Sequence, residues 1–156
     1  TSSTGPGGVV VEAPCALEAV SKPSRSVVYC DWRLTIDPQK RRVTTRVYDK
    51  RQDMPLFRGC RTFPHRYSMI HYPAKLNVIT SRFLCFARRS TAMCDFVAAT
   101  ADLVYRMVRD GYDAGRVMRM VYHFRHRWHP EATKLGRWTT FYDNFRVELC
   151  RLLRRR

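Results

Sequence analysis

The residue whose chemistry stands out first is Asp31, in the stretch YCDW at positions 29–32. Two adjacent carboxylates at such a place would hold the two magnesium ions of a phosphoryl-transfer site, but Trp32 stands where the second carboxylate would be. A single carboxylate cannot hold and orient two divalent ions. Upstream, only Glu12 and Glu18 are available, and neither lies in a strand pattern. We therefore expect no catalytic role for Asp31 and place it on the exposed face of a β-hairpin.

A second candidate is the run YHFRHRWHP, in which His123, His126 and His129 recur every three residues. Two of these imidazoles could share a metal on a helix, with Cys94 or Cys150 as a further ligand. The spacing matches no standard zinc motif, however, and the interleaved arginines repel a cation. We find no glycine-rich phosphate loop and no local nucleophile motif. The sequence thus predicts neither a metal site, nor a cofactor, nor an enzyme.

The charge of the chain points to a polyanionic partner. Its 156 residues contain 29 Lys and Arg against 13 Asp and Glu, a net charge of +16, and most of the cations are arginine. A charge this unbalanced repels itself unless a polyanion neutralises it. Arginine forks bind phosphate oxygens in pairs and stack on bases, so RNA is the expected partner. An anionic membrane surface is the weaker alternative, and no apolar run approaches the ~20 residues that span a bilayer.

The cations are concentrated in residues 38–92, where 13 Lys and Arg face only two Asp. A further basic stripe lies along a predicted helix near residue 120, on the side opposite its apolar residues, where a solvated polar face is the alternative. Acidic residues are rare on that stripe, which favours phosphate contacts. The candidate RNA-binding residues are Lys40, Arg41, Arg42, Arg46, Lys50, Arg51, Arg58, Arg61, Arg66, Lys75, Arg82, Arg88, Arg89, Arg116, Arg119 and Arg127.

Several aromatic residues lie close to these cations in the sequence. They are Tyr48, Phe63, Tyr67, Tyr72 and Trp128. Such rings can stack on unpaired bases. Packing in the protein core is an equal or better expectation for each of them.

The elements that must position these side chains divide the chain into four parts. Residues 1–26 are predicted to be a flexible tail, because they begin with small, polar, glycine-rich sequence. Residues 27–49 read as a β-hairpin. The alternation places one set of residues on a buried face: Val28, Cys30, Trp32, Leu34 and Ile36. Residues 50–73 contain several Pro and a Gly and are predicted to be a basic, irregular connector that orders only on RNA, together with the hairpin loop 38–42.

Residues 74–156 are predicted to be helical, with apolar stripes marking about four helices whose apolar sides face a common core. The second of these helices is expected to end near Gly111, and Asp113 is the expected N-cap of the third. The sequence therefore predicts an α+β fold, in which an N-terminal β-hairpin is followed by a helical bundle.

The six cysteines are scattered without a Cys-x-x-Cys pair, which suits free thiols in a reducing, intracellular compartment. The chain begins with Thr1 rather than Met, and a cleaved organellar transit peptide would fit this start. A mitochondrion is the compartment that we expect first.

The order of short motifs over about residues 27–128 resembles the reverse transcriptases of retroelements, of the Penelope-type and non-LTR classes. These enzymes carry an aromatic-Leu-Asp strand after their catalytic strands, then a Thr-x-x-Tyr-Asp-Lys-Arg segment and a Pro-His with a Ser-Asn-Ile-like element. A helix with Ser-x-x-x-Arg-Phe-x-Arg follows, and then helices around a Phe and a Gly-Tyr. The corresponding residues here are Tyr29-Cys30-Asp31, Thr45, Tyr48-Asp49-Lys50-Arg51, Pro64-His65, Ser68-Met69-Ile70, Ser81, Phe83, Phe86, Ala87, Arg88, Phe96 and Gly111-Tyr112. The chain departs from the pattern at Cys30, where Leu is usual, and at Met69, where Asn is usual.

The resemblance implies that the hairpin corresponds to the primer-grip region and the helices to the thumb, which holds a nucleic-acid duplex by its backbone. The first hypothesis is a non-catalytic RNA-binding protein derived from such a thumb, acting beside other proteins as a structural part of a ribonucleoprotein such as an organellar ribosome. The second is a thumb fragment or subunit of an active reverse transcriptase whose catalytic palm is on another chain.

Overall fold

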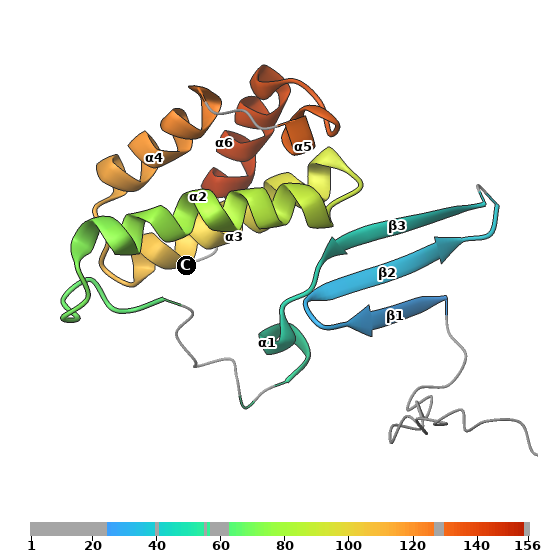
Figure 1. Cartoon of the computed structure of the whole chain (residues 1–156), viewed down its shortest axis with the longest axis horizontal. Coiled ribbons are helices and arrows are strands. Elements are labelled where there is room, and N and C mark those ends of the chain that lie inside the picture. Colours follow the sequence, from blue (N-terminus) through green and yellow to red (C-terminus); the bar gives the residue numbers. More distant parts are fainter. Residues whose placement is uncertain (1–24, 40, 55, 57–62, 127–129, 155–156) are drawn as a thin grey trace, which may run out of the picture.

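The computed structural model of the chain describes residues 25–39, 41–54, 56, 63–126 and 130–154. Three antiparallel strands come first and helices follow, which confirms the predicted α+β class (Figure 1). The strands are β1 (Ser26–Tyr29), β2 (Trp32–Asp37) and β3 (Arg42–Val47). The helices are α1 (Lys50–Asp53), α2 (Tyr72–Arg89), α3 (Met93–Arg109), α4 (Ala114–His126), α5 (Pro130–Thr133) and α6 (Trp138–Arg154).

The sheet corrects one prediction, because the single strand expected from residue 27 onward is two strands. β1 and β2 pair in antiparallel fashion with Tyr29 opposite Trp32, so Cys30 and Asp31 form a two-residue turn. Cys30 adopts φ 53°, in the left-handed region that a residue in such a tight turn must often use. Across this two-residue turn, the residues that face one side of the sheet change from odd-numbered to even-numbered positions. The sequence does not reveal the change, because its alternating pattern continues through the turn.

The sheet is also much more exposed than predicted. Strand pairing places Val27 opposite Leu34, on the side of Trp32, whereas Val28 lies opposite Arg33 on the other side. The expected grouping of Val28 with Trp32 was therefore wrong. The predicted burial was wrong as well, because Trp32 and Leu34 are only half-buried and four other large apolar residues of the sheet retain about half or more of their surface. Their exposed fractions are 50% for Val27, 71% for Tyr29, 53% for Ile36 and 49% for Val43.

This exposure follows from how the sheet is attached to the helices. β3 contacts α2 and α3, whereas β1 is exposed along its whole length and is the strand farthest from α2 and α3 (Figure 1). The join is a set of hydrogen bonds between Thr45 on β3 and Thr91 in the α2–α3 linker. The Thr91 amide and hydroxyl each donate to the Thr45 carbonyl at 2.9 Å, and the Thr45 amide donates back to the Thr91 hydroxyl. The sheet thus projects from the helices and carries β1 into solvent.

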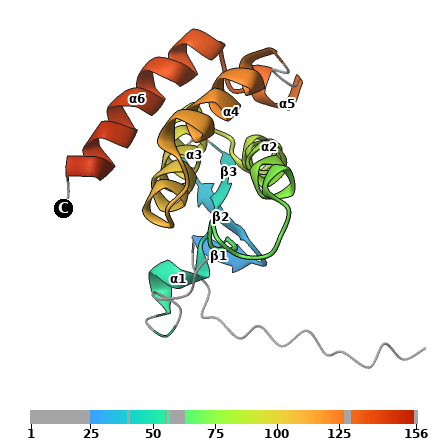
Figure 2. The ribbon, with the colours of Figure 1, turned by 90° about the vertical axis from the view of Figure 1, so that its left-hand side faces the viewer.

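The helices enclose a single core of aromatic and aliphatic side chains. α3 lies between α2 and α6 and packs against both, and α4 packs on α2 and α3 (Figure 2). The largest buried side chains of the helices come from the predicted stripes, in which they recur every three or four residues. The largest fully buried ones are Ile79, Phe83, Phe96, Thr100, Val104, Met107, Val117, Val121, Phe124, Phe141 and Phe145.

Helix ends agree with the predicted caps. The Asp113 carboxylate accepts a hydrogen bond of 2.8 Å from the amide of Arg116, which is N-capping geometry for α4. After α3, Gly111 adopts φ 88°, a conformation that favours glycine. α2 starts at Tyr72, slightly earlier than predicted, with a Pro at its first turn where the missing amide is harmless.

The described parts of the connector 50–73 are more regular than predicted. Its start forms the one-turn helix α1, and its end is fixed to the helices at several points. Phe63 joins the core with 6% of its surface exposed, and the Tyr112 hydroxyl donates to the Pro64 carbonyl at 2.7 Å. The segment from Phe63 to Ser68 is therefore part of the folded domain, because its backbone finds partners there. Residues 57–62 and the tail 1–24 lie outside the described residues.

Candidate nucleic-acid interface

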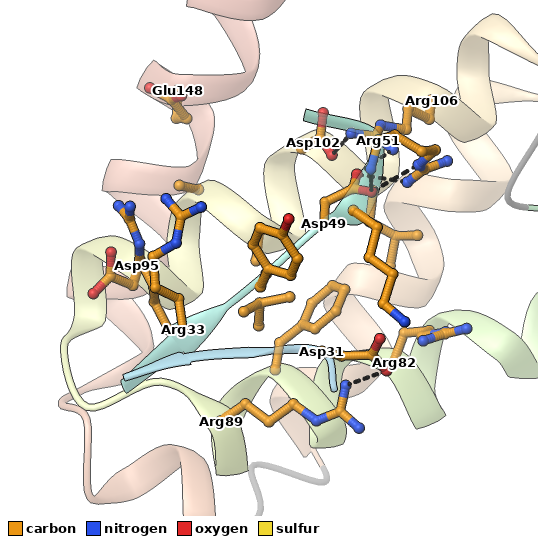
Figure 3. A pocket seen from close by; sticks show the side chains of 18 of the residues that line it. Asp31, Arg33, Asp49, Arg51, Arg82, Arg89, Asp95, Asp102, Arg106 and Glu148 are labelled. Atoms are coloured by element: carbon orange, nitrogen blue, oxygen red, sulfur yellow. Dashed lines mark hydrogen bonds and ion pairs between the residues drawn. The ribbon is translucent and has the colours of Figure 1, made fainter. Parts of the chain in front are cut away.

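A cavity of about 620 Å³ opens where β3 and the start of α1 meet α2, α3 and α6 (Figure 3). Its lining combines many charges with a few apolar walls. The cations are Arg33, Arg46, Lys50, Arg51, Arg82, Arg89, Arg106 and Arg151. The carboxylates are Asp31, Asp49, Asp95, Asp102 and Glu148. Eight cations against five anions leave an excess of positive charge facing the cavity.

One end of the cavity is built by an ion-pair network around Asp49, the residue that precedes α1. Its carboxylate lies 2.7 Å from Arg51 and 2.8 Å from Arg106 on α3 (Figure 3). Arg106 also pairs with Asp102, one helical turn earlier, at 2.6 Å. Side-chain exposures near 20% for Asp49 and Arg51 strengthen these pairs relative to fully solvated ones. The network fixes the chain after β3 against α3.

The carboxyl of Asp102 has a raised pKa within this network. The pKa of the Asp102 carboxyl is raised to about 6, mainly by partial burial and also by the nearby Asp49 carboxylate, while the Arg51 guanidinium opposes the shift. The direct contact with Arg106, at 2.6 Å, favours the charged form and opposes this shift. The Asp102 carboxyl therefore takes up a proton at a higher pH than an ordinary aspartate does.

Asp31 pairs with a cation in this structure. Its carboxylate lies 3.2 Å from the guanidinium of Arg89 on α2, and Arg82 lies beside this pair (Figure 3). The same guanidinium lies over the Trp32 ring, 6.0 Å from the ring centroid. The β1–β2 turn thereby reaches the wall of the cavity through Asp31, instead of pointing it into open solvent on the hairpin face as predicted.

Three cations of the cavity are available for an external anion. Within the part of the chain that the structure describes, Arg46, Lys50 and Arg82 have no carboxylate within ion-pair distance. Arg46 lies on β3, Lys50 starts α1 and Arg82 lies on α2, so they reach the cavity from three elements. All three line the same cavity, so a phosphate bound there would meet positive charge that no described carboxylate neutralises.

The structure brings part of the predicted RNA-binding set together and disperses the rest. The cavity gathers Arg46, Lys50, Arg51, Arg82 and Arg89. The residues that lie elsewhere on the surface are Arg41 and Arg42 at the β2–β3 end, Arg66 in the connector, Arg88 on α2, and Arg116 and Arg119 on α4. The residues outside the described part of the chain are Lys40, Arg58, Arg61 and Arg127.

Lys75 does not belong to a phosphate-binding surface. Only 3% of its surface is exposed, and its ammonium donates to the carbonyls of His65, Arg66 and Ser68 at 3.3, 2.7 and 2.8 Å. These three carbonyls come from one turn of the connector, which folds over the first turn of α2. The charge of Lys75 thus satisfies buried backbone acceptors, and its prediction as an RNA contact is withdrawn.

Three cavity arginines, Arg33, Arg106 and Arg151, were missing from the predicted set because the prediction followed local charge density. Arg106 and Arg151 each lie within one helical turn after an acidic residue, the spacing of a helical ion pair, which is a signal of a fixed guanidinium. Arg33 pairs with Asp53 on α1 at 2.8 Å, a contact over 20 residues that no local pattern predicts.

The aromatic residues named from the sequence lie in different environments. Phe63 is core, and Tyr72 packs against the core with the Arg116 guanidinium 5.4 Å from its ring centroid. Tyr48 lines the cavity under Arg33, at 4.9 Å, and a hydrogen bond with Asp53 is the main cause that raises the pKa of its hydroxyl. Tyr67 is 78% exposed. Trp128 lies outside the described residues.

The described part of the chain also bears on metal, thiol and membrane chemistry. It contains no group of three or more His, Cys, Asp or Glu side chains placed to hold a metal, and His129 and the side chain of His126 lie outside it. Cys30, Cys85 and two further cysteines of α3 and α6 are free thiols. None of the helices in these ranges is both long and apolar enough to cross a bilayer.

Comparison with known proteins gives no relative from which a role could be transferred. The chain matches no protein-family model, no curated protein and no solved structure. Its function has to be inferred from the cavity and the charges themselves.

Proposed function

We propose that this chain is a non-catalytic RNA-binding protein, derived from a reverse-transcriptase thumb and acting as a structural component of a ribonucleoprotein such as an organellar ribosome. The observation that carries the proposal is the cavity at the junction of β3, α1 and α2, into which Arg46, Lys50 and Arg82 bring positive charge that no described carboxylate neutralises. The net charge of +16 supports a polyanion as the partner.

The paired arginines of the cavity contribute to phosphate binding as well. Asp49 holds Arg51 and Arg106, and Asp31 holds Arg89, so these guanidinium planes are fixed before RNA arrives. A guanidinium has five N–H donors, and a carboxylate occupies at most two of them. The remaining donors present a preorganised surface to phosphate oxygens. Contacts of this kind read the backbone and position the RNA without selecting a sequence.

The charge pairing also supports a binding role over catalysis. In the cavity, Asp49 and Asp102 lie against guanidinium groups, and Asp31 does so at the turn. Carboxylates that orient two divalent ions in a phosphoryl-transfer site must be free to converge on them. The arrangement found here instead favours the carboxylates as holders of arginine.

The exposed apolar face of the sheet favours a second candidate, in which this chain is the thumb part of an active reverse transcriptase whose palm is on another chain. Val27, Tyr29, Ile36 and Val43 leave about half or more of their surface uncovered, which suits a protein neighbour. A ribonucleoprotein would supply such a neighbour too, so the two candidates differ in the partner's activity. Template-dependent nucleotide incorporation by the co-purified native assembly would favour the second.

The test of the proposal is a pair of charge reversals with equal changes in net charge. R46E/R82E removes two of the unneutralised cations of the cavity, and R25E/R109E removes two exposed cations elsewhere. Binding of a structured RNA is measured by fluorescence anisotropy at several salt concentrations. We expect R46E/R82E to weaken binding strongly and to reduce the log–log salt slope by about two, because each phosphate contact contributes about one.

The control double variant should bind RNA nearly as tightly as the wild type. If both variants lose affinity equally, net charge rather than the cavity governs binding. Wild-type affinity that does not change with salt would contradict RNA binding through phosphates altogether.

A further inference from the structure

The α4–α6 edge of the bundle carries a cluster of aromatic side chains that the cavity does not use. Tyr122 on α4 and Tyr142 on α6 have ring centroids 5.0 Å apart at 53° (Figure 1 shows the two helices). Trp138, one turn before Tyr142, stacks on it at 5.7 Å and 25°. Tyr142 and Trp138 pack against the core, whereas Tyr122 keeps 46% of its surface exposed.

The surroundings of this cluster are mainly basic, with Asp143 as the acidic side chain that also acts on Tyr142. The Arg146 guanidinium lies 6.0 Å from the centroid of the Tyr142 ring. Arg119 and Arg125 are exposed one turn before and about one turn after Tyr122 on α4. A partly exposed aromatic pair between cations suits a flat, electron-rich ligand that carries negative charge along its backbone. A neutral apolar peptide would leave these arginines without an anionic partner.

We propose that the Tyr122–Tyr142 pair is a second RNA contact, which stacks on an unpaired base while the neighbouring arginines hold the adjoining phosphates. The inference rests on the proposed RNA-binding function and adds a different recognition chemistry to it. Bases present π-faces to aromatic rings whatever their sequence, and removal of one such ring reduces affinity by about five- to 150-fold. The expected ligand is therefore a single-stranded segment beside structured RNA.

This contact is separate from the phosphate-binding cavity. Arg151, which lines the cavity, follows Tyr142 by nine residues, or two and a half helical turns. The two side chains therefore leave α6 on opposite flanks. Substitutions at the aromatic pair and in the cavity can be tested independently.

The experiment compares two RNAs that carry the same number of phosphates. Each is a hairpin with a ten-nucleotide single-stranded extension, and in one of them the extension is abasic. We expect the wild type to bind the base-bearing RNA about tenfold more tightly. Y122L should lose most of this preference, Y122F should retain it, and both should retain the wild-type melting temperature because the ring is half exposed.

A matched control is Y29L, which removes a tyrosine that is 71% exposed on β1. It should leave the preference unchanged. A wild type that binds both RNAs equally, with a normal salt slope, would overturn the base contact but leave the proposed function standing. A preference for the base-bearing RNA that is unchanged in Y122L would do the same. Failure of the wild type to bind either RNA would overturn the proposed function itself.

Discussion

Replacing Lys75 with Met separates a structural lysine from an RNA-binding one. Methionine keeps the unbranched apolar stem in the core and removes the ammonium. The carbonyls of His65, Arg66 and Ser68 then lose their donor, while the connector still folds over α2. Hydrogen bonds from a charged donor each contribute about 1.5–3 kcal/mol.

Two of the three bonds to Lys75 are short, at 2.7 and 2.8 Å, and the third is long, at 3.3 Å. Removal of the buried ammonium also removes its desolvation penalty, which offsets part of the loss. We therefore expect K75M to lower the free energy of unfolding by about 3 kcal/mol. Urea denaturation followed by far-UV circular dichroism measures this change.

The RNA-binding properties of K75M provide the other half of the comparison. The salt slope of RNA binding, measured where the variant is folded, should equal that of the wild type, because Lys75 contacts no phosphate. R88M is the matched variant on the exposed side of the same helix. It should cost little stability and, if Arg88 contacts a phosphate, lower the slope by about one. A K75M protein of wild-type stability whose slope falls by one would refute the assignment of Lys75 as a structural residue.

Two further predictions concern the core and the ion-pair network. F83A should lower the free energy of unfolding by about 3–5 kcal/mol, because this ring is fully buried and meets Phe124 edge to face, with the ring centroids 5.2 Å apart. Chemical denaturation measures this change, and a loss below about 1 kcal/mol would contradict the packing described. The carboxyl of Asp102 has a folded-state pKa of about 6, above its ordinary 3.8, so its stabilising contribution is complete below about pH 4 and disappears as the pH rises through 6. Wild-type stability should therefore fall relative to that of D102N between pH 4 and pH 7, and parallel pH profiles of the two proteins would contradict the raised pKa.

The sequence by itself determined the helical part of the fold. The spacing of Ile79, Phe83 and Phe86 places them on one side of a helix whatever else the chain does, because the period is local. Asp113 and Gly111 marked the α3–α4 boundary for equally local reasons: one caps amides with its side chain, and the other tolerates a positive φ. These predictions succeeded because each needs only a few neighbouring residues.

The turn at Cys30 was not determined by the sequence in this way. Val27 and Val28 are both apolar, so either can start the alternating pattern. The sequence therefore does not show that the residues after the turn at 30–31 face the opposite side from the one that simple alternation predicts. Only the pairing of Tyr29 with Trp32 shows where the strand reverses. The exposure of the sheet depends on its attachment to the helices through β3, which is a tertiary contact.

The cavity, finally, was decided by the tertiary structure alone. Asp31 and Arg89 are 58 residues apart, and no local rule pairs them. Charge density along the chain found Arg82 and Lys75 equally, yet one faces the cavity and the other is buried beneath three carbonyls. The sequence determined that the chain carries excess positive charge, whereas folding decided which cations neutralise its own oxygens and which remain for an external phosphate.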